Sequence, residues 1–513
     1  MAYLRQNVWE LGGDWADPIL WYARGVGAMK ALPLAEPSAW RFYGAMHGFL
    51  SPLWKELGYL SKTDKLPSSG LQKQFWKQCQ HGSWYFLPWH RGYLIAFEAT
   101  VRAEIVKLGG PSDWALPYWN YFKAGESALP PAFASADWPD GKGNNPLFVI
   151  QRYGPNNDGN VYVPLNEVNL NALTDPDFTG VASGGSPGFG GVDTGFMHSG
   201  TVHGGLETQP HDYVHGLVGG SNPKNTQQPG LMSDPDSAGL DPIFWLHHGN
   251  IDRLWEVWRQ NPASHLNPTD PKWLGGPASH GGRAFMMPMP DGTTWTYKPS
   301  DMVDLAALGY SYDDYSEAVA VPAPAVRLEA LGFTVSAGEK AAGAHIMKAQ
   351  NSVEMVGATK GAVSVVGTDI ATSVVLDKTV RQKVSASLTP GLGKTAPDRV
   401  FLNLENVRGT VDSTAFHVYV GIPDGSSPSD HPELLAGSIA LFGVRKASQP
   451  DEEHGGEGLT FVLEITKIVD KLHIDNSLDV DSLNVRLVPI HEVSKDANVS
   501  VGRISIYRQG LSG

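Results

Sequence analysis

The tryptophans of this chain are confined to its first three hundred residues. All sixteen lie between Trp9 and Trp295, and the remaining part of the 513-residue chain contains none. A single hydrophobic core stops growing at about 250–300 residues, beyond which a chain divides into domains. We therefore expect a first domain over residues 1–318 and a second over residues 331–513, joined by a proline-rich linker at residues 319–330.

The first domain has the pattern of a mainly α-helical fold. Segments 92–107 and 242–259 carry apolar residues at spacings of three and four, which is typical of amphipathic helices. Stretches rich in glycine and proline separate such segments, and residues 174–205 are expected to form one long loop. We predict an antiparallel helix bundle connected by long loops.

The second domain has a β pattern. Short segments rich in β-branched residues are separated by Gly, Asp, Asn or Pro turns. They are residues 362–366, 373–376, 415–420 and 483–488. This pattern predicts an antiparallel β-sandwich. In the linker, the alternating prolines of VPAPAV disfavour a helix and predict an extended conformation.

Charge and hydropathy exclude two classes of partner. The net charge is −14 and the chain has no basic cluster, which argues against nucleic acid, and no apolar run approaches the ~18 residues of a membrane span. The start lacks a secretory signal pattern, and the single cysteine, Cys79, excludes an intrachain disulfide. We expect a cytoplasmic protein with a small, neutral or weakly charged substrate. Whether it forms a homo-oligomer stays open.

Eleven of the seventeen histidines precede residue 300, and four clusters of them have metal-binding potential. His211 and His215 stand four residues apart, so on a helix both rings project from one face and could hold one metal ion. Such a pair alone is weak evidence, because it also arises by chance. His81, His90 and His47 each lie in an aromatic-rich stretch. Taken alone, His90 is better explained as a core or capping histidine than as a ligand, and His47 has the same ambiguity.

The fourth cluster, DPIFWLHHGNIDRLW, is expected to be a helix that begins with Asp241 as its N-cap. Adjacent residues on a helix point about 100° apart, so normally only one of His247 and His248 can face a given metal. His247 falls on the apolar packing stripe, which favours His248 as the ligand. Asp252 could accept a hydrogen bond from a ligand imidazole, or it could pair with Arg253.

Six histidines emerge as candidate ligands, with no obligatory bridging carboxylate. They are His47, His81, His90, His211, His215 and His248. Imidazole-rich sites suit copper, zinc, iron or nickel, and the order of affinities favours copper without deciding the matter.

Four strings of sequence resemble the copper-binding signatures of the tyrosinase, catechol oxidase and haemocyanin superfamily. They are HGSWYFLPWHRGYLIAFE, ALPYWNYF, LETQPHDYVHGLVGG and SAGLDPIFWLHHGNIDRLW. The resemblance covers about residues 40–320 and includes YSYDDY, which is similar to the motif that closes the family's catalytic domain. Weaker similarity to plant and fungal polyphenol oxidases continues through FLNLENVRGT, FHVYVGIP and GSIALFG.

The resemblance implies two copper ions per chain and dioxygen as co-substrate. Copper A would be bound by the first three of the six histidines and copper B by the last three. The implied reactions convert monophenols to o-diphenols and o-diphenols to o-quinones. Other readings of the same motifs are a catechol oxidase or o-aminophenol oxidase without activity on monophenols, a haemocyanin-like oxygen carrier and, remotely, a dizinc hydrolase.

Further residues take roles only through the resemblance. Cys79 would form a thioether with His81, unless it is a free buried cysteine. Glu207 would hold a water molecule that helps to deprotonate the phenol, unless it is a solvated loop carboxylate. Asp212 replaces the asparagine that often follows the first copper B histidine, and Pro235 and Gly216 would line an open substrate entrance.

The second domain resembles the one that covers the active site in latent polyphenol oxidases. We therefore expect partial latency, with the linker as a place for proteolytic release. Sequence does not reveal which residue would plug the site, and neither Met286 to Met289 nor the HGGEG loop can be assigned.

Overall fold

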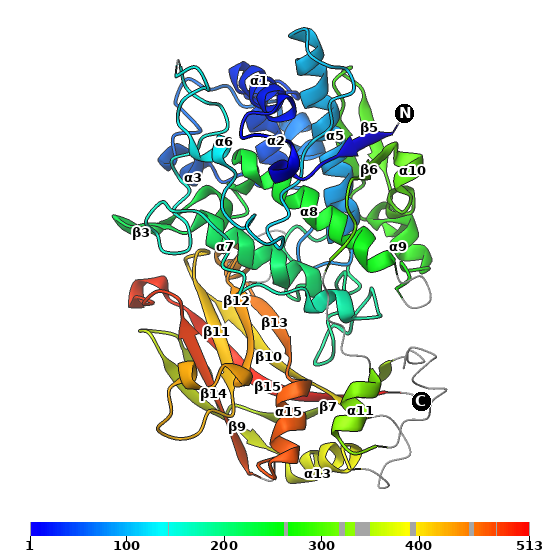
Figure 1. Ribbon diagram of the computed structural model, residues 1–513, viewed down its shortest axis with the longest axis vertical. Coiled ribbons are helices and arrows are strands. Elements are labelled where there is room, and N and C mark those ends of the chain that lie inside the picture. The colour runs from blue at the N-terminus through cyan, green and yellow to red at the C-terminus, as the bar shows by residue number, and fades with distance from the viewer. Residues whose placement is uncertain are drawn as a thin grey trace.

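The computed structural model describes residues 2–141, 143–260, 265–317, 324–333, 349–389, 397–450, 456–478 and 480–511. A helical N-terminal domain lies against a mostly β C-terminal domain (Figure 1). Each has its own buried apolar cluster, and the cluster of the helical domain also includes Ala440 and Phe442 from the β domain. The histidines therefore belong to one domain, while part of their surroundings comes from the other. Among the described residues, no helix is long and apolar enough to cross a membrane.

The long helix α5 (Phe86–Lys107) is central to the N-terminal domain. It packs against α1 (Asp17–Ala31) and α8 (Pro242–Arg259), and Phe97 of α5 stacks on Trp245 of α8. Both helices predicted from spacing, 92–107 and 242–259, are confirmed as parts of α5 and α8. The remaining helices are α2 (Trp40–His47), α3 (Ser51–Glu56), α4 (Ser69–Phe75), α6 (Pro131–Ala134), α7 (Tyr213–Gly219), α9 (Pro271–Gly275) and α10 (Leu305–Leu308).

The start of α8 is built as its sequence predicts. Asp241 accepts a hydrogen bond from the amide of Ile243 at 3.0 Å, and Pro242 occupies the first turn, where its missing N–H has no partner to lose. Arg152 donates to the same carboxylate. These contacts hold the N-terminal end of α8 in place, one to two turns ahead of His247 and His248 in the chain.

Short two-stranded sheets and long loops complete the helical domain. The pairs are β1 (Tyr3–Arg5) with β6 (Tyr310–Tyr312), β2 (Ser221–Asn222) with β3 (Asn225–Pro229), and β4 (Phe285–Pro288) with β5 (Thr294–Tyr297). Residues 175–204 contain no helix and only isolated bridges, so the expected long loop is confirmed. One of those bridges joins Val202 to Thr460 of the other domain.

The strands of the C-terminal domain are β7 (Ala349–Ala358), β8 (Val363–Ser364), β9 (Ile370–Leu376), β10 (Arg399–Arg408), β11 (Ala415–Val420), β12 (Leu435–Ala440), β13 (Leu459–Glu464), β14 (Ser482–Pro489) and β15 (Ser500–Leu511). Three of the four predicted β segments are strands over their whole length, and the fourth, residues 362–366, is a strand only at Val363–Ser364. The nine strands form one antiparallel sheet in the order β12-β11-β14-β9-β7-β15-β10-β13, and β8 pairs with β15. The two end strands, β12 and β13, also contact each other. The sheet therefore curls over its core, rather than forming the two separate sheets of the predicted sandwich.

The linker prediction is wrong in its second half. Residues 318–323 lie outside the described residues, but Pro324–Ala330 forms helix α11. Proline is tolerated at the first position of a helix, and only Pro324 falls inside this one. Arg327 of α11 pairs with Asp470 at 2.7 Å, on α15 (Thr466–Ile474), so the helix packs on the C-terminal domain. The other helices there are α13 (Lys378–Ser387) and α14 (Val444–Ala447).

Candidate metal centre

Two groups of buried side chains gather between α2, α5, α7 and α8. In each group the potential ligand atoms all lie within 4.8 Å of one another. The groups are His47, Cys79, His81 and His90, and His211, His215, His247 and His248. His47 ends α2, His90 lies in α5, and His211 stands in the helical segment η3 (Glu207–Asp212). The structure thus brings together all six histidines predicted from the sequence.

Most of these imidazoles are held through one ring nitrogen. Nδ1 of His47 donates to the carbonyl of Pro235 at 2.8 Å, that of His90 to Phe86 at 2.8 Å, and that of His215 to Met232 at 2.7 Å. Those bonds place the proton on Nδ1 and leave the lone pair on Nε2, the tautomer a metal requires.

Among the described residues, no polar partner is offered to Nε2 of His47 or of His211, although both atoms are buried. A buried nitrogen without a hydrogen bond costs free energy unless a ligand satisfies it. The donor set therefore fits metal ions that prefer imidazole nitrogen.

Burial keeps these imidazoles neutral. Loss of solvent lowers the pKa of His47 to about 4, and it lowers the pKa of His81, His90, His211, His215 and His248 well below the ordinary value. Neighbouring histidines of the same centre lower the pKa further for most of them. A metal ion would therefore meet deprotonated ligands at neutral pH without competing against bound protons.

The two groups face each other through His248. Its ring stacks on His90 of the first group with centroids 4.4 Å apart, and its Nε2 lies 3.3 Å from Nε2 of His215 in the second. His247 lies on the far side, with Nδ1 3.3 Å from the hydroxyl of Tyr121. Both His247 and His248 have a ring nitrogen within the second group, whereas the 100° angle between adjacent residues of a helix implied that only one of them would. The position between the groups nevertheless favours His248 as the ligand, with His247 behind it.

The prediction that Asp252 accepts a hydrogen bond from a ligand histidine is wrong. Asp252 instead accepts from Arg91 at 2.6 Å, from Tyr310 at 2.7 Å and from Tyr312 at 2.6 Å. The alternative pairing with Arg253 is also absent, because Arg253 binds Asn250 and Glu317. Two buried arginines, Arg5 and Arg91, attract the carboxylate away from the histidines.

This arrangement gives the YSYDDY motif a structural role. Tyr310 and Tyr312, two of its three tyrosines, donate to Asp252 of α8, and Asp252 binds Arg91, the residue after His90 in α5. The ion pair therefore joins the helix that carries a histidine of the first group to the helix that carries one of the second. Nothing in the local sequence around Arg91 or Arg5 indicated this link.

Cys79 lies inside the first group. Its Sγ is 3.5 Å from Nδ1 and 3.4 Å from Nε2 of His81, and 3.3 Å from Nε2 of His90. The first two distances are almost equal, so the sulfur lies about equally far from the two ring nitrogens of His81. Burial raises the pKa of the thiol, so the cysteine is a neutral, enclosed group beside His81.

Glu207 is not a solvated loop carboxylate. It is 1% exposed, and both its oxygens accept from the amide of Gly82, at 2.9 and 3.0 Å. Burial raises its pKa to about 8, against the opposing charge of His203. The carboxylate thus stands where it can take up or release a proton near neutral pH.

Asp212 connects His211 to a histidine that sequence reasoning did not select. One oxygen lies 2.9 Å from Nδ1 of His211 and the other 2.6 Å from Nδ1 of His203. His203 also lies 3.8 Å from Glu207, and the three side chains form a third compact polar group. The aspartate that departs from the family pattern therefore orients His211 and shares His203 with Glu207.

The β domain covers the centre with an aromatic ring. Phe442 follows β12, and its ring centroid lies 4.3 Å from that of His215, 5.5 Å from His81 and 5.7 Å from His211. It contacts both groups and is 1% exposed. The string GSIALFG contains this residue, but no local pattern separates it from an ordinary core phenylalanine.

Both predicted entrance residues lie under the same domain. A Cβ at Gly216 would stand 3.1 Å from Cβ of Ala440, and one at Gly443 would stand 3.6 Å from Cγ of Pro235. Pro235 also holds His47 through its carbonyl. Access to the histidines past these residues thus requires the β domain to move.

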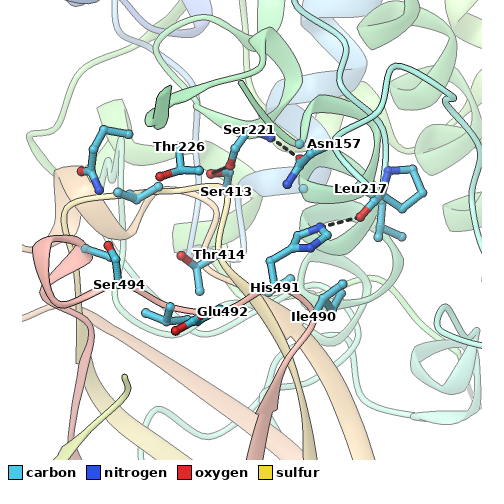
Figure 2. Close-up of a pocket in the computed structure, with 18 of the residues that line it drawn as sticks. Asn157, Leu217, Ser221, Thr226, Ser413, Thr414, Ile490, His491, Glu492 and Ser494 are labelled. Carbon is cyan, nitrogen blue, oxygen red and sulfur yellow. Dashed lines mark hydrogen bonds between the residues drawn. The ribbon is translucent and has the colours of Figure 1, made fainter. Parts of the chain in front are cut away.

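Polar contacts hold the two domains together around the centre. Arg445 donates to Asp234 at 2.7 Å, and the side-chain amide of Gln209 donates to the carbonyl of Ser438 at 2.8 Å. Farther from the centre, a cavity of about 80 Å³ lies between the two domains and is lined by residues of both (Figure 2). At its edge His491 donates to the carbonyl of Pro155 at 2.7 Å. This cavity is not the histidine centre, which Phe442 fills.

Comparison with known proteins identifies the family. The model of the common central domain of tyrosinase matches residues 37–261, and a domain of unknown function matches residues 352–509. A tyrosinase from Hahella sp. (strain CCB-MM4) is 33% identical over 98% of this chain and 99% of its own length. A chloroplastic polyphenol oxidase from Malus domestica is 26% identical over 94% of this chain and 74% of its own length.

Solved structures extend the likeness to the whole fold. The latent tyrosinase of apple covers 99% of this chain and 97% of its own with a TM-score of 0.58, at 23% identity. The chain therefore belongs to the tyrosinase and polyphenol oxidase family. By that membership it is a copper-binding oxidoreductase that acts on phenols with dioxygen.

Proposed function

We propose that the chain binds two coppers and acts on both monophenols and o-diphenols. Copper A would be held by His47, His81 and His90, and copper B by His211, His215 and His248. The observation that carries the proposal is the pair of facing groups of neutral, buried imidazoles, several fixed through Nδ1 with Nε2 turned inward. When bound, a copper pair supplies the activation of dioxygen and the electron transfer.

The protein's own residues bind and orient the phenol and move its proton. The space that Phe442 occupies, against three histidine rings, has the size and shape of one aromatic ring. Glu207 is placed to hold a water or accept the phenol proton, with His203 and Asp212 sharing the charge. Pro235 leaves the copper A side free of a bulky side chain, which favours monophenols.

Oxygen uptake tests the proposal directly. Copper-loaded full-length protein would be supplied with a monophenol, the matching o-diphenol and an o-aminophenol, before and after activation with mild detergent or acid. We expect uptake with monophenol and diphenol. Uptake with the diphenol or o-aminophenol alone would favour the narrower oxidase, and reversible oxygen binding without turnover would favour a carrier.

We predict that Glu207→Gln lowers the rate on monophenols by about a hundredfold, the usual contribution of a general base, and changes the rate on o-diphenols far less. The amide keeps the shape and the contact with Gly82 but cannot accept a proton. The measurement is the ratio of the two rates in full-length protein. Glu167→Gln is the matched control, because Glu167 binds Tyr213 outside the centre. Equal losses on both substrates would contradict the role.

We further propose that Cys79 and His81 become joined by a thioether. The bond would remove the thiol hydrogen and one ring hydrogen, with dioxygen at the copper site as the oxidant. We expect a peptide that contains both residues to be lighter by two hydrogens after copper loading in air, and to resist alkylation after denaturation. Cys79→Ser is the control. A cysteine that is fully alkylated in active protein would refute the bond.

We also propose that the C-terminal domain is a lid that keeps the enzyme partly latent. Its Phe442 occupies the space where a phenol ring would bind, and its Arg445 is paired with the helical domain. A substrate can therefore bind only in the state in which the lid has moved away from the histidines.

A further inference from the structure

We propose that Asp234 and Asp236 select phenols that carry a positive charge on the side chain opposite the hydroxyl. The inference rests on the proposed function, because it concerns which phenol the opened site prefers. Both carboxylates belong to the short stretch between η4 (Leu231–Ser233) and η5 (Ala238–Leu240), on either side of Pro235. Both side chains are buried in the closed structure.

This stretch lies beside the first histidine group. The carbonyl of Pro235 accepts the Nδ1–H of His47, and a Cβ at Gly48 would stand 2.9 Å from Oδ1 of Asp236. The carboxylate of Asp236 is thus packed against the residue that follows His47. A substrate ring that lies over the histidines would have these two acids within reach of its side chain.

The lid shows what kind of group these acids bind. Arg445 lies 2.7 Å from Asp234 and 3.1 Å from Asp236, and the ammonium of Lys446 lies 4.0 Å from Asp236. The same tip of the lid inserts Phe442 between the histidines, three residues earlier in the chain. An aromatic ring in the centre and a cation on the acids therefore come from one short segment.

Opening the lid removes the ring and the cations together. Asp412, which also binds Arg445, leaves as well, because it belongs to the lid. On the helical domain Lys77 opposes part of the negative charge of Asp236. Of these groups, Asp234, Asp236 and Lys77 stay on the helical domain, and the two carboxylates outnumber the lysine beside a space for one aromatic ring. Phenols with an ammonium group on a short chain match both features, whereas phenols with a carboxylate match only the ring.

The test uses full-length copper-loaded protein and three probes of similar size: tyramine, 4-ethylphenol and 3-(4-hydroxyphenyl)propionate. Arg445→Gln is the reference variant, because it loosens the lid and keeps both acids. Asp234→Asn/Asp236→Asn loosens the same contact from the other side and removes the acids. We expect the ratio of kcat/KM for tyramine to kcat/KM for the propionate to be at least about five in the reference variant, as one exposed ion pair allows. In the double variant this ratio should be near one.

A purely structural role of the two acids would raise or lower all three rates together and leave the ratio unchanged. The ratio in the reference should also shrink in 1 M salt, since screening weakens exposed charge pairs. The single variant Asp236→Asn, with an intermediate ratio expected, serves if the double variant does not fold. Equal ratios in reference and acid variants would overturn the inference while phenol oxidation stands. If no variant oxidises any probe, the proposed function fails and the inference fails with it.

Discussion

Replacing His248 with alanine is expected to leave about one copper per chain instead of two, and to lower phenol oxidation by at least about a hundredfold. His248 stacks on His90 and approaches His215, so it stands between the two histidine groups. Its loss would leave copper B with two imidazoles and an open side toward copper A. Metal analysis of the purified chain and oxygen uptake with an o-diphenol provide the measurements.

His247→Ala is the matched control for that experiment. The two histidines are consecutive, equally buried and within the same group, but His247 contacts the hydroxyl of Tyr121 on the side away from the first group. We expect this variant to keep both coppers and most of its activity. If His247→Ala loses copper while His248→Ala keeps it, the assignment of the ligand is reversed.

Phe442→Ala is expected to raise the rate of full-length protein toward that of the activated enzyme. Burial of a phenylalanine side chain is worth about 1.5–3 kcal/mol, so removing the ring should increase the open population by about tenfold to a hundredfold. The truncation also empties the space against His81, His211 and His215 even while the lid stays docked. Oxygen uptake without detergent or acid measures the effect.

Phe442→Leu is the control, because leucine keeps an apolar plug of smaller size. Its rate should fall between those of wild type and the alanine variant. Thermal unfolding of each variant shows whether the lid remains folded. A docked, folded Phe442→Ala protein that is as slow as wild type would contradict the shielding role of this ring.

The sequence predicted what depends on neighbours along the chain. Helices α5 and α8, the cap at Asp241 and the strand segments of the C-terminal domain all rest on local spacing or on one local hydrogen bond, and the structure has them. The short helix α11 was missed because two prolines, one before it and one at its first position, dominated the pattern, although a proline at the first position of a helix is tolerated.

What the sequence could not show depends on residues far apart in the chain. Asp252 was expected to bind a histidine one turn away, but it pairs with Arg5 and Arg91, 247 and 161 residues distant. Phe442 reaches the histidines from another domain. The periodicity of the sequence carries no information on contacts between such distant residues. His203, by contrast, stands only four residues before Glu207, so that contact is local and was simply not selected from the sequence. The six histidines were found because the motifs around them resemble those of a known family.

The ion pair between Arg91 and Asp252 has a consequence for how the centre takes up its metal. His90 and Arg91 are consecutive in α5, and Asp252 lies one turn beyond His248 in α8, so separating the two histidine groups would break a buried ion pair held by two tyrosines. Breaking such a pair is strongly unfavourable. The distance between the two histidine groups is therefore fixed when the polypeptide folds. Incoming metal ions bind to groups that are already spaced, and they do not have to bring the two helices together.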